Sequence, residues 1–206
     1  MTLAYASRVN PAAVPNALAC AVFIITAFVL SGVAHVLWLR SAASMRLAFP
    51  VDCGISFRGK RIFGDHKMLR GFVMMIPATG AAFWLLFVIF QTAFPNLAGR
   101  LWTFAPREYA VLGLWAGFGF MAGELPNSFM KRRLDIAPGT IPLQSSVRYI
   151  CLIADRVDSI LGMLLALSVI VVVPALTWIY VISFGAAIHW SFSAMLFVLG
   201  VKQRIA

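Results

Sequence analysis

Four long apolar segments restrict the fold of this chain more than any other feature. They cover residues 16–39, 71–94, 109–123 and 159–201. A helix needs about 20 apolar residues to cross ~30 Å of hydrocarbon, so the last segment, about twice that length, should hold two helices. Its break is expected between residues 174 and 183, because lipid cannot replace the backbone donor that proline lacks. The sequence predicts an all-α, polytopic membrane helix bundle of about five transmembrane helices.

Composition supports a single integral membrane domain over residues 1–206. Hydrophobic residues make up 62% of the chain and charged residues 12%, whereas soluble domains carry roughly 25% charged residues. The apolar segments leave no stretch long enough for a separate soluble domain, and the first exceeds the ~7–15 residue core of a signal peptide. Cys20, Cys53 and Cys151 are far apart and outside any C-x-x-C pattern, so we interpret them as structural.

The distribution of Lys and Arg predicts the orientation. Five spans place residues 40–70, residues 124–158 and the C-terminal tail on one side, with fourteen of the 17 basic residues. Arg8, Arg100 and Arg107 fall on the other side. We therefore expect the protein to lie in the cell membrane or inner membrane. The charged loops and the C-terminus should face the cytoplasm, and the N-terminus should face the outside. The same bias explains the net charge of +10 without a nucleic-acid partner.

Acidic residues gather on the predicted cytoplasmic side, although the positive-inside rule does not require it. Six of the seven lie there: Asp52, Asp65, Glu124, Asp135, Asp155 and Asp158. Carboxylates interleaved with cations suit a site for metal and phosphate. We expect two cytoplasmic loops to form this site.

The first charged cluster covers residues 50–72. Its glycines allow tight turns, and cations such as Lys67 and Arg70 can hold phosphate oxygens. Asp52 and Asp65 are the weaker candidates for metal ligands. The alternative is a solvated basic loop that contacts anionic lipid head groups.

The second cluster covers residues 123–139. Glu124 falls at the cytoplasmic end of the third span, where ionisable groups are usually paired or functional. Lys131, Arg132 and Arg133 follow seven to nine residues later and could neutralise a triphosphate. The alternative is a stop-transfer cluster of charges.

The third cluster opens the fourth span. Asp155 and Asp158 are three residues apart, on one face of a helix, where two bare carboxylates should repel. A bridging divalent cation such as Mg²⁺, which takes oxygen ligands, would explain the pair. The alternative is an N-cap aspartate with a second one in the first turn.

His189, near the middle of the last span, is either functional or part of a buried hydrogen bond between helices. No other ionisable residue occupies the central part of a span, which argues against a transporter or channel. The absence of a Ser-His-Asp order, an H-E-x-x-H motif and a Walker loop argues against a hydrolase, a zinc protease and a P-loop ATPase.

These clusters resemble the CDP-archaeol synthase family, membrane cytidylyltransferases related to phosphatidate cytidylyltransferase. The family pattern P-x-D-x-G followed by G-R-R-x-x-G-D-H-K-T-W-R-G-F is matched by Pro50, Asp52, Gly54, Gly59, Arg61, Gly64, Asp65, His66, Lys67, Arg70, Gly71 and Phe72. The pattern G-D-L-x-x-S-F-x-K-R-R resembles residues 123–133, and D-Q-x-D resembles residues 155–158. The final pattern, H-x3-N-x3-Y-x2-G-x-K, is matched at His189, Gly200 and Lys202.

The resemblance implies that a lipid phosphate attacks the α-phosphorus of CTP and releases pyrophosphate. Its implied metal ligands for Mg²⁺ are Glu124, Asp155 and Asp158, and less firmly Asp52 and Asp65. Lys131 joins the first three as a catalytic residue, and the implied phosphate-binding residues are Gly64, Lys67, Arg70, Ser128, Arg132 and Arg133. The bilayer, CTP and a membrane lipid phosphate are the implied partners.

Several residues depart from the family pattern. Met68 and Leu69 replace Thr and Trp, Glu124 replaces Asp, Arg156 replaces Gln, and Ser193 and Phe197 replace Asn and Tyr. The carboxylates are kept, but the altered last helix leaves a second hypothesis open. In this alternative the chain keeps the fold as a non-catalytic lipid-binding or scaffold protein.

Overall fold

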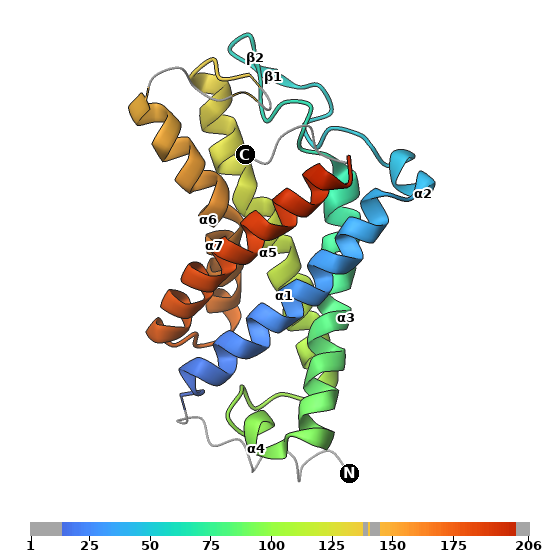
Figure 1. Ribbon diagram of the computed structural model, residues 1–206, viewed down its shortest axis with the longest axis vertical. Helices are drawn as coiled ribbons and strands as arrows, with labels where there is room; N and C mark the ends of the chain where they lie inside the picture. The colour runs from blue at the N-terminus through green and yellow to red at the C-terminus, as the bar shows by residue number, and fades with distance from the viewer. Residues whose placement is uncertain (1–13, 138–139, 141–144, 201–206) are drawn as a thin grey trace.

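The computed structural model describes residues 14–137, 140 and 145–200. The described residues form seven helices and one two-stranded hairpin (Figure 1). The helices are α1 (Ala17–Leu39), α2 (Ala42–Met45), α3 (Leu69–Ala93), α4 (Pro95–Ala98), α5 (Pro106–Arg133), α6 (Ser145–Ile170) and α7 (Ala175–Val198), and the antiparallel strands are β1 (Ser56–Phe57) and β2 (Lys60–Arg61). The expected helical membrane bundle is confirmed.

Five of the helices are long, as expected. Of these, α1, α3 and α7 are long and apolar enough to cross a membrane by length and composition alone. Helices α1 and α3 match the predicted segments within two residues at each end. The last apolar segment holds two helices, as expected, but the break between them covers residues 171–174 and meets the expected interval of residues 174–183 only at Pro174, the N-cap of α7.

The second charged segment differs from its prediction. We expected residues 124–158 to form a loop, but α5 continues to Arg133 and α6 already begins at Ser145. Most charged residue types in this segment have no strong preference against a helix. Glu124 and Asp155 also form ion pairs with lysines of neighbouring elements. The helices can therefore continue beyond the apolar segments. Asp155 and Asp158 therefore lie inside α6, which excludes the N-cap interpretation.

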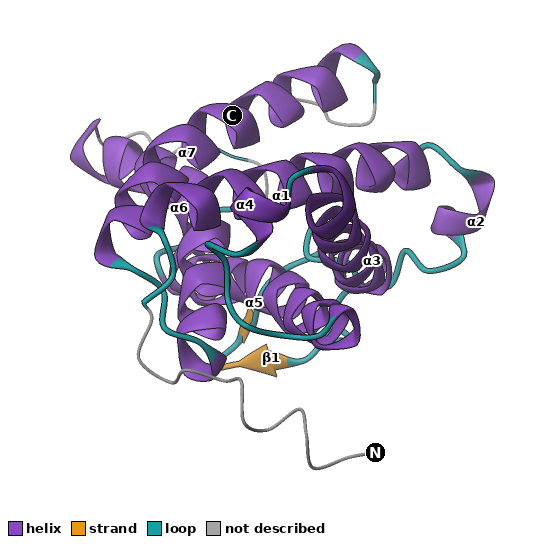
Figure 2. Ribbon diagram, turned by 90° about the horizontal axis from the view of Figure 1, so that it is seen from below, coloured by secondary structure: helices purple, strands orange, loops and turns teal. Residues whose placement is uncertain are grey.

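Helices α3 and α5 run side by side, and α1 packs against α3 (Figure 1). An aromatic cluster stabilises this contact, with the ring of Phe23 5.0 Å from Phe83 and 5.4 Å from Tyr109 between centroids. The Tyr109 hydroxyl donates to the carbonyl of Trp102 at 2.7 Å, so its buried polar atom is satisfied. Seen along the bundle, α7 lies at an edge beside α1 and α6 (Figure 2).

Glycines bring α5 and α6 together. A Cβ atom on Gly123 of α5 would lie 2.5 Å from the carbonyl oxygen of Asp158, and one on Gly162 of α6 would lie 2.4 Å from the carbonyl oxygen of Gly119. Only hydrogen fits at these positions, so the two backbones approach more closely than larger residues would allow. Because Glu124 follows Gly123 and Asp158 precedes Gly162 by four residues, this contact brings their carboxylates into the same region.

Candidate active site

A cavity of about 830 Å³ lies among α1, α3, α5, α6, α7 and the loop before α3. Eight of the residues predicted from the sequence line it: Lys67, Arg70, Glu124, Ser128, Lys131, Arg132, Asp155 and Asp158. The tertiary structure thus unites parts of all three charged clusters. The rest of the lining is largely apolar and comes mostly from α1, α6 and α7.

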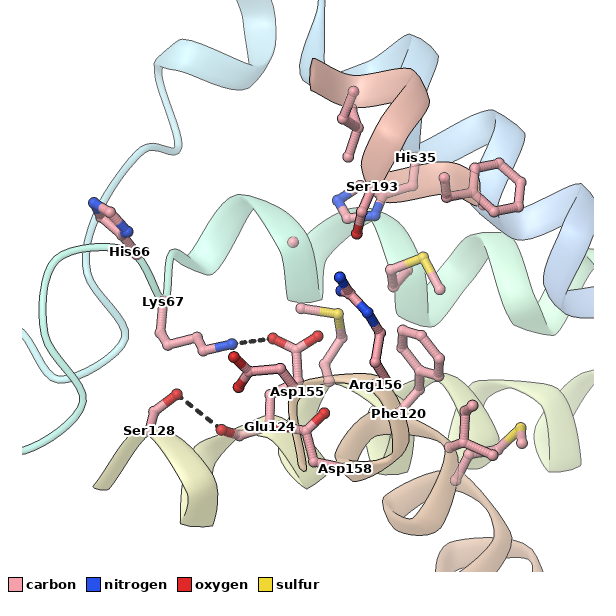
Figure 3. Close-up of a pocket in the computed structure, with 18 of the residues that line it drawn as sticks. His35, His66, Lys67, Phe120, Glu124, Ser128, Asp155, Arg156, Asp158 and Ser193 are labelled. Atoms are coloured by element: carbon pink, nitrogen blue, oxygen red, sulfur yellow. Dashed lines mark hydrogen bonds and ion pairs between the residues drawn. The ribbon is translucent and has the colours of Figure 1, made fainter. Parts of the chain in front are cut away.

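Two ammonium groups pair with two carboxylates inside the cavity. Lys67 Nζ contacts Glu124 Oε2 (Figure 3), and Lys131 Nζ binds both oxygens of Asp155, at 2.6 Å from Oδ2. Burial by itself lowers the pKa of Lys67, but the charge and hydrogen bond of Glu124, with smaller contributions from the two aspartates, raise it above its ordinary value. Lys67 is therefore a cation at neutral pH.

Asn127 and Ser159 link the three carboxylates. The Asn127 amide donates to Asp155 Oδ1 at 2.6 Å and to Asp158 Oδ2 at 2.8 Å. The Ser159 hydroxyl donates to Glu124 Oε1 at 2.9 Å. Hydrogen bonds between side chains therefore hold the carboxylates of α5 and α6 in one network.

The donor set of this network has the chemistry of a Mg²⁺ site. Carboxylate, amide and hydroxyl oxygens are hard ligands of the kind that Mg²⁺ takes. Among the residues that the structure describes, no group of three or more His, Cys, Asp or Glu is arranged closely enough to hold a metal ion as it stands. The oxygens of Glu124 and Asp155 are instead in contact with lysine ammonium groups.

Arg132 adds a buried positive charge to the cavity wall. The residue is 9% exposed, and its Nε and Nη1 atoms have no hydrogen-bond partner within the described part of the chain. A buried guanidinium is costly to leave without acceptors, so this position favours an anionic ligand. Ser128, one turn earlier in α5, donates to the main-chain carbonyl of Glu124 at 2.9 Å.

Asp52 and Asp65 lie in the loop and pair with Arg61 instead of lining the cavity. Both oxygens of Asp52 are already engaged, because they also accept hydrogen bonds from the backbone N–H groups of Gly54, Phe63 and Gly64 at 3.0–3.2 Å. Burial raises the pKa of Asp52, but these bonds and Arg61 outweigh it and hold the pKa well below its usual range. The geometry favours a structural role for Asp52 over the expected metal ligand.

Arg133 and Gly64 also belong to the frame of the loop. The Arg133 guanidinium donates to the carbonyls of Phe57, Lys60 and Arg61, the last two at 3.0 and 2.8 Å, and lies over the rings of Phe57 and Phe129. It therefore ties the end of α5 to the hairpin, a role that differs from the expected phosphate contact. Gly64 has a φ of 86°, which a side chain would strain, and donates to Asp52.

Our sequence interpretation missed two members of the network. Asn127 follows Glu124 by three residues, so both fall on one face of a helix, but we had treated this stretch as a loop. Ser159 is adjacent to Asp158 and carried no signal of its own. The side chain of His189 and the structure around Lys202 lie outside the described residues.

The fold and the cavity together define a class of protein: an integral membrane helix bundle with a charged site where phosphate groups and apolar chains can meet. A sequence model of the CarS-like family, described as CDP-archaeol synthase, matches residues 22–205. The chain belongs to the CDP-archaeol synthase family. It is accordingly a CDP-archaeol synthase-like, CTP-dependent cytidylyltransferase.

Curated relatives and a solved structure agree with this assignment. The CDP-archaeol synthase of Halobacterium salinarum is 31% identical over 161 residues, covering 75% of this chain and 82% of that protein. The enzyme of Methanosphaerula palustris is 29% identical over 164 residues, covering 75% and 87%. A solved intramembrane enzyme of archaeal membrane lipid biosynthesis matches 83% of this chain and 90% of its own, with a TM-score of 0.57 and 21% identity, which supports the fold.

Proposed function

We propose that the cavity transfers the cytidylyl group of CTP to the phosphate of a membrane lipid. An oxygen of the lipid phosphate forms a bond to the α-phosphorus of CTP, and the bond from that phosphorus to the oxygen bridging to the β-phosphate breaks. The electron pair leaves with pyrophosphate, and a CDP-lipid remains. The observation that carries this proposal is the network of three carboxylates and two lysines in a cavity with an apolar wall.

Glu124, Asp155 and Asp158 are the residues that would hold Mg²⁺ in this site. When bound, Mg²⁺ would neutralise charge on the phosphate oxygens and make the α-phosphorus easier to attack. Asn127 and Ser159 would orient the carboxylates, because each already donates to one or two of them. Asp52 and Asp65, whose oxygens face Arg61, are left out of this ligand set.

Lys67, Lys131 and Arg132 would bind the triphosphate. The two ammonium groups now rest on carboxylates, and a nucleotide carrying its own metal would give them phosphate oxygens as alternative partners. Positive charge at these positions would stabilise the pyrophosphate as it leaves. The lysines would thereby neutralise the carboxylates when no nucleotide is bound and the phosphate oxygens when the nucleotide is bound.

The position of the cavity suits both substrates. Its charged residues come from the loop before α3, the start of α3, α5 and α6, whereas α1 and α7 contribute mostly apolar residues to its wall. We propose that the charged end faces the cytoplasm, where CTP is available, and that the lipid chains remain among the helices.

The proposal is tested by incubating the purified protein with Mg²⁺, labelled CTP and a panel of lipid phosphates that includes phosphatidic acid and an archaeal-type ether lipid phosphate. A labelled lipid product is expected, and the lipid that reacts names the substrate class. If no lipid reacts and Mg²⁺-dependent binding of CTP is also absent, the catalytic proposal fails and the non-catalytic alternative is favoured.

A further inference from the structure

A second group of polar side chains lies in the same cavity, between the carboxylate network and helices α1 and α7. It comprises His35 of α1, Arg156 of α6 and Ser193 of α7, all of which line the cavity. Figure 3 shows the Arg156 side chain extending away from Asp155 and Asp158 toward Ser193 and His35. The cavity therefore presents a further set of polar groups beside the carboxylate network.

The His35 imidazole has an unused hydrogen-bonding atom inside the cavity. Its Nε2 atom is buried and has no hydrogen-bond partner within the described part of the chain. The atom faces the start of α3, since a Cβ atom on Gly71 would lie 4.0 Å from it. Arg70, the neighbour of Gly71, also lines the cavity. An imidazole N–H and nearby guanidinium groups are suitable donors for an anion.

Helices α1 and α7 contribute mostly apolar side chains to the cavity around this group. Ile25 and Phe28 of α1 and Ile188 and Leu196 of α7 line the cavity beyond it. The ring of Phe192 packs directly on α1, because a Cβ atom on Gly32 would lie 2.9 Å from its Cζ atom. A charged phosphate entering from this side would leave water and would need a cation to offset the loss.

The proposed reaction brings two anionic substrates together, and their combined negative charge needs more cations than the triphosphate alone requires. The triphosphate is assigned to Lys67, Lys131 and Arg132, beside the carboxylates. A lipid phosphate with a free terminal phosphate carries close to two negative charges at neutral pH, and a planar guanidinium matches two of its oxygens at once. Helix α6 contributes two guanidinium groups to the cavity lining, Arg148 and Arg156, and Figure 3 shows that Arg156 extends toward Ser193 and His35.

We propose that Arg156 and His35 form a second phosphate subsite, which binds the phosphate monoester of the acceptor lipid while its hydrocarbon chains lie against α1 and α7. This inference rests on the proposed function. It adds where the phosphate of the acceptor lipid binds and that this phosphate is a doubly charged monoester. The subsite places the lipid phosphate beside the carboxylate network, toward Ser193 of α7 and His35 of α1. The attacking oxygen is then delivered from the membrane side of the nucleotide.

The test compares Arg156→Gln, Arg156→Lys and His35→Phe with the wild-type protein. Binding of dioctanoyl phosphatidic acid, with dioctanoylglycerol as the phosphate-free probe, is measured by native mass spectrometry, and KM values for lipid phosphate and CTP are measured in mixed micelles. We expect Arg156→Gln to raise the lipid KM about ten-fold and His35→Phe about three-fold, with partial rescue in Arg156→Lys. CTP binding should change less than about two-fold, which also shows that each variant is folded.

Arg107→Gln, the same substitution at the exposed start of α5, is the matched control and should leave both KM values unchanged. The subsite is overturned if Arg156→Gln binds phosphatidic acid like the wild type, or if the wild type does not prefer it to dioctanoylglycerol. Arg156-dependent binding of phosphatidic acid without transfer to any lipid would support the subsite and contradict the proposed reaction. The two proposals can therefore fail separately.

Discussion

Two aspartates near cations in this protein differ in what surrounds their oxygens. The side chain of Asp52 is fully buried and accepts hydrogen bonds from Arg61 and three backbone N–H groups, so it has little capacity for a ligand. The side chain of Asp155 is 38% exposed, lines the cavity and accepts from one lysine and one amide. Saturation by backbone donors distinguishes a structural carboxylate from one that can exchange partners.

Replacing either cavity aspartate should therefore stop catalysis. Asp155→Asn and Asp158→Asn remove a negative charge from the proposed metal ligands and should lower kcat about 100-fold or more while the bundle stays folded. Turnover of labelled CTP and thermal unfolding in detergent check both points. Asp135→Asn is a suitable control, because Asp135 is exposed, pairs with Lys60 and has a φ of 58° that asparagine tolerates. Wild-type turnover by either cavity variant would refute the metal assignment.

Lys131→Ala should weaken nucleotide binding. The substitution removes a cation from the proposed triphosphate site and leaves Asp155 without its ammonium partner. We expect the Kd for CTP to rise about ten-fold in the presence of Mg²⁺, as measured by calorimetry. Lys60→Ala removes a lysine that pairs with Asp135 outside the main cavity and should have little effect. An equal loss of CTP affinity in the two variants would mean that net charge, and not a contact made by Lys131, determines binding.

Asp52 should stabilise the loop in a pH-dependent way. Its pKa is lowered in the folded protein, so its contribution is complete above the unfolded value of about 4 and is lost as the pH falls toward the folded value. Asp52→Asn should lower the melting temperature at pH 7, by an amount equivalent to about 2 kcal/mol. The difference from the wild type should narrow below about pH 4. A constant difference across this range would show that the carboxylate charge is not the cause.

At the scale of elements, the contact between α5 and α6 decides whether the site exists. Gly119, Gly123 and Gly162 leave no room for a methyl group between the two backbones. Asn127 donates to both aspartates of α6, so the amide can bridge the helices only at this separation. The glycine contacts between α5 and α6 therefore set the distance across which Asn127 can bind the two aspartates.

Gly123→Ala and Gly162→Ala should push these helices apart. We expect a destabilisation of about 1–3 kcal/mol from overpacking, and a larger fall in cytidylyl transfer than stability alone explains, because the carboxylates separate. Gly99→Ala is the control, since its Cβ atom would meet Pro95 O at an ordinary 3.5 Å. Thermal unfolding and turnover are measured on the same preparations. Normal turnover in both interface variants would mean that the carboxylates tolerate a wider spacing.

At the scale of the whole molecule, the bundle is divided between an aromatic core and a polar cavity. Phe23, Phe83 and Tyr109 close the contact among α1, α3 and α5, whereas Lys67, Glu124 and Asp155 lie in the cavity beside the loop and α6. This division would allow a lipid to stay among the helices while its phosphate reaches charged groups. It also makes the proposed orientation in the membrane testable.

The three cysteines offer a direct test of that orientation. Cys53 is exposed in the loop, whereas Cys20 and Cys151 are buried. A membrane-impermeant thiol reagent should label Cys53 in inside-out vesicles and spare it in intact cells, because the loop should face the cytoplasm. Asn96→Cys in a Cys53→Ser background places a thiol beyond the other end of α3 and should show the opposite pattern. Labelling of Cys53 in intact cells would reverse the proposed topology.

Hydrophobic length by itself determined the helical membrane bundle, and the ordered clusters at residues 50–72, 123–139 and 155–158 pointed to the CDP-archaeol synthase family. These features are local, because a lipid environment fixes how long an apolar helix must be and the motifs are contiguous. Only the tertiary structure separated Asp155, in the cavity, from Asp52, saturated by its own loop. It also added Asn127 and Ser159, because hydrogen bonds between α5 and α6 depend on how closely their glycines let the two helices approach.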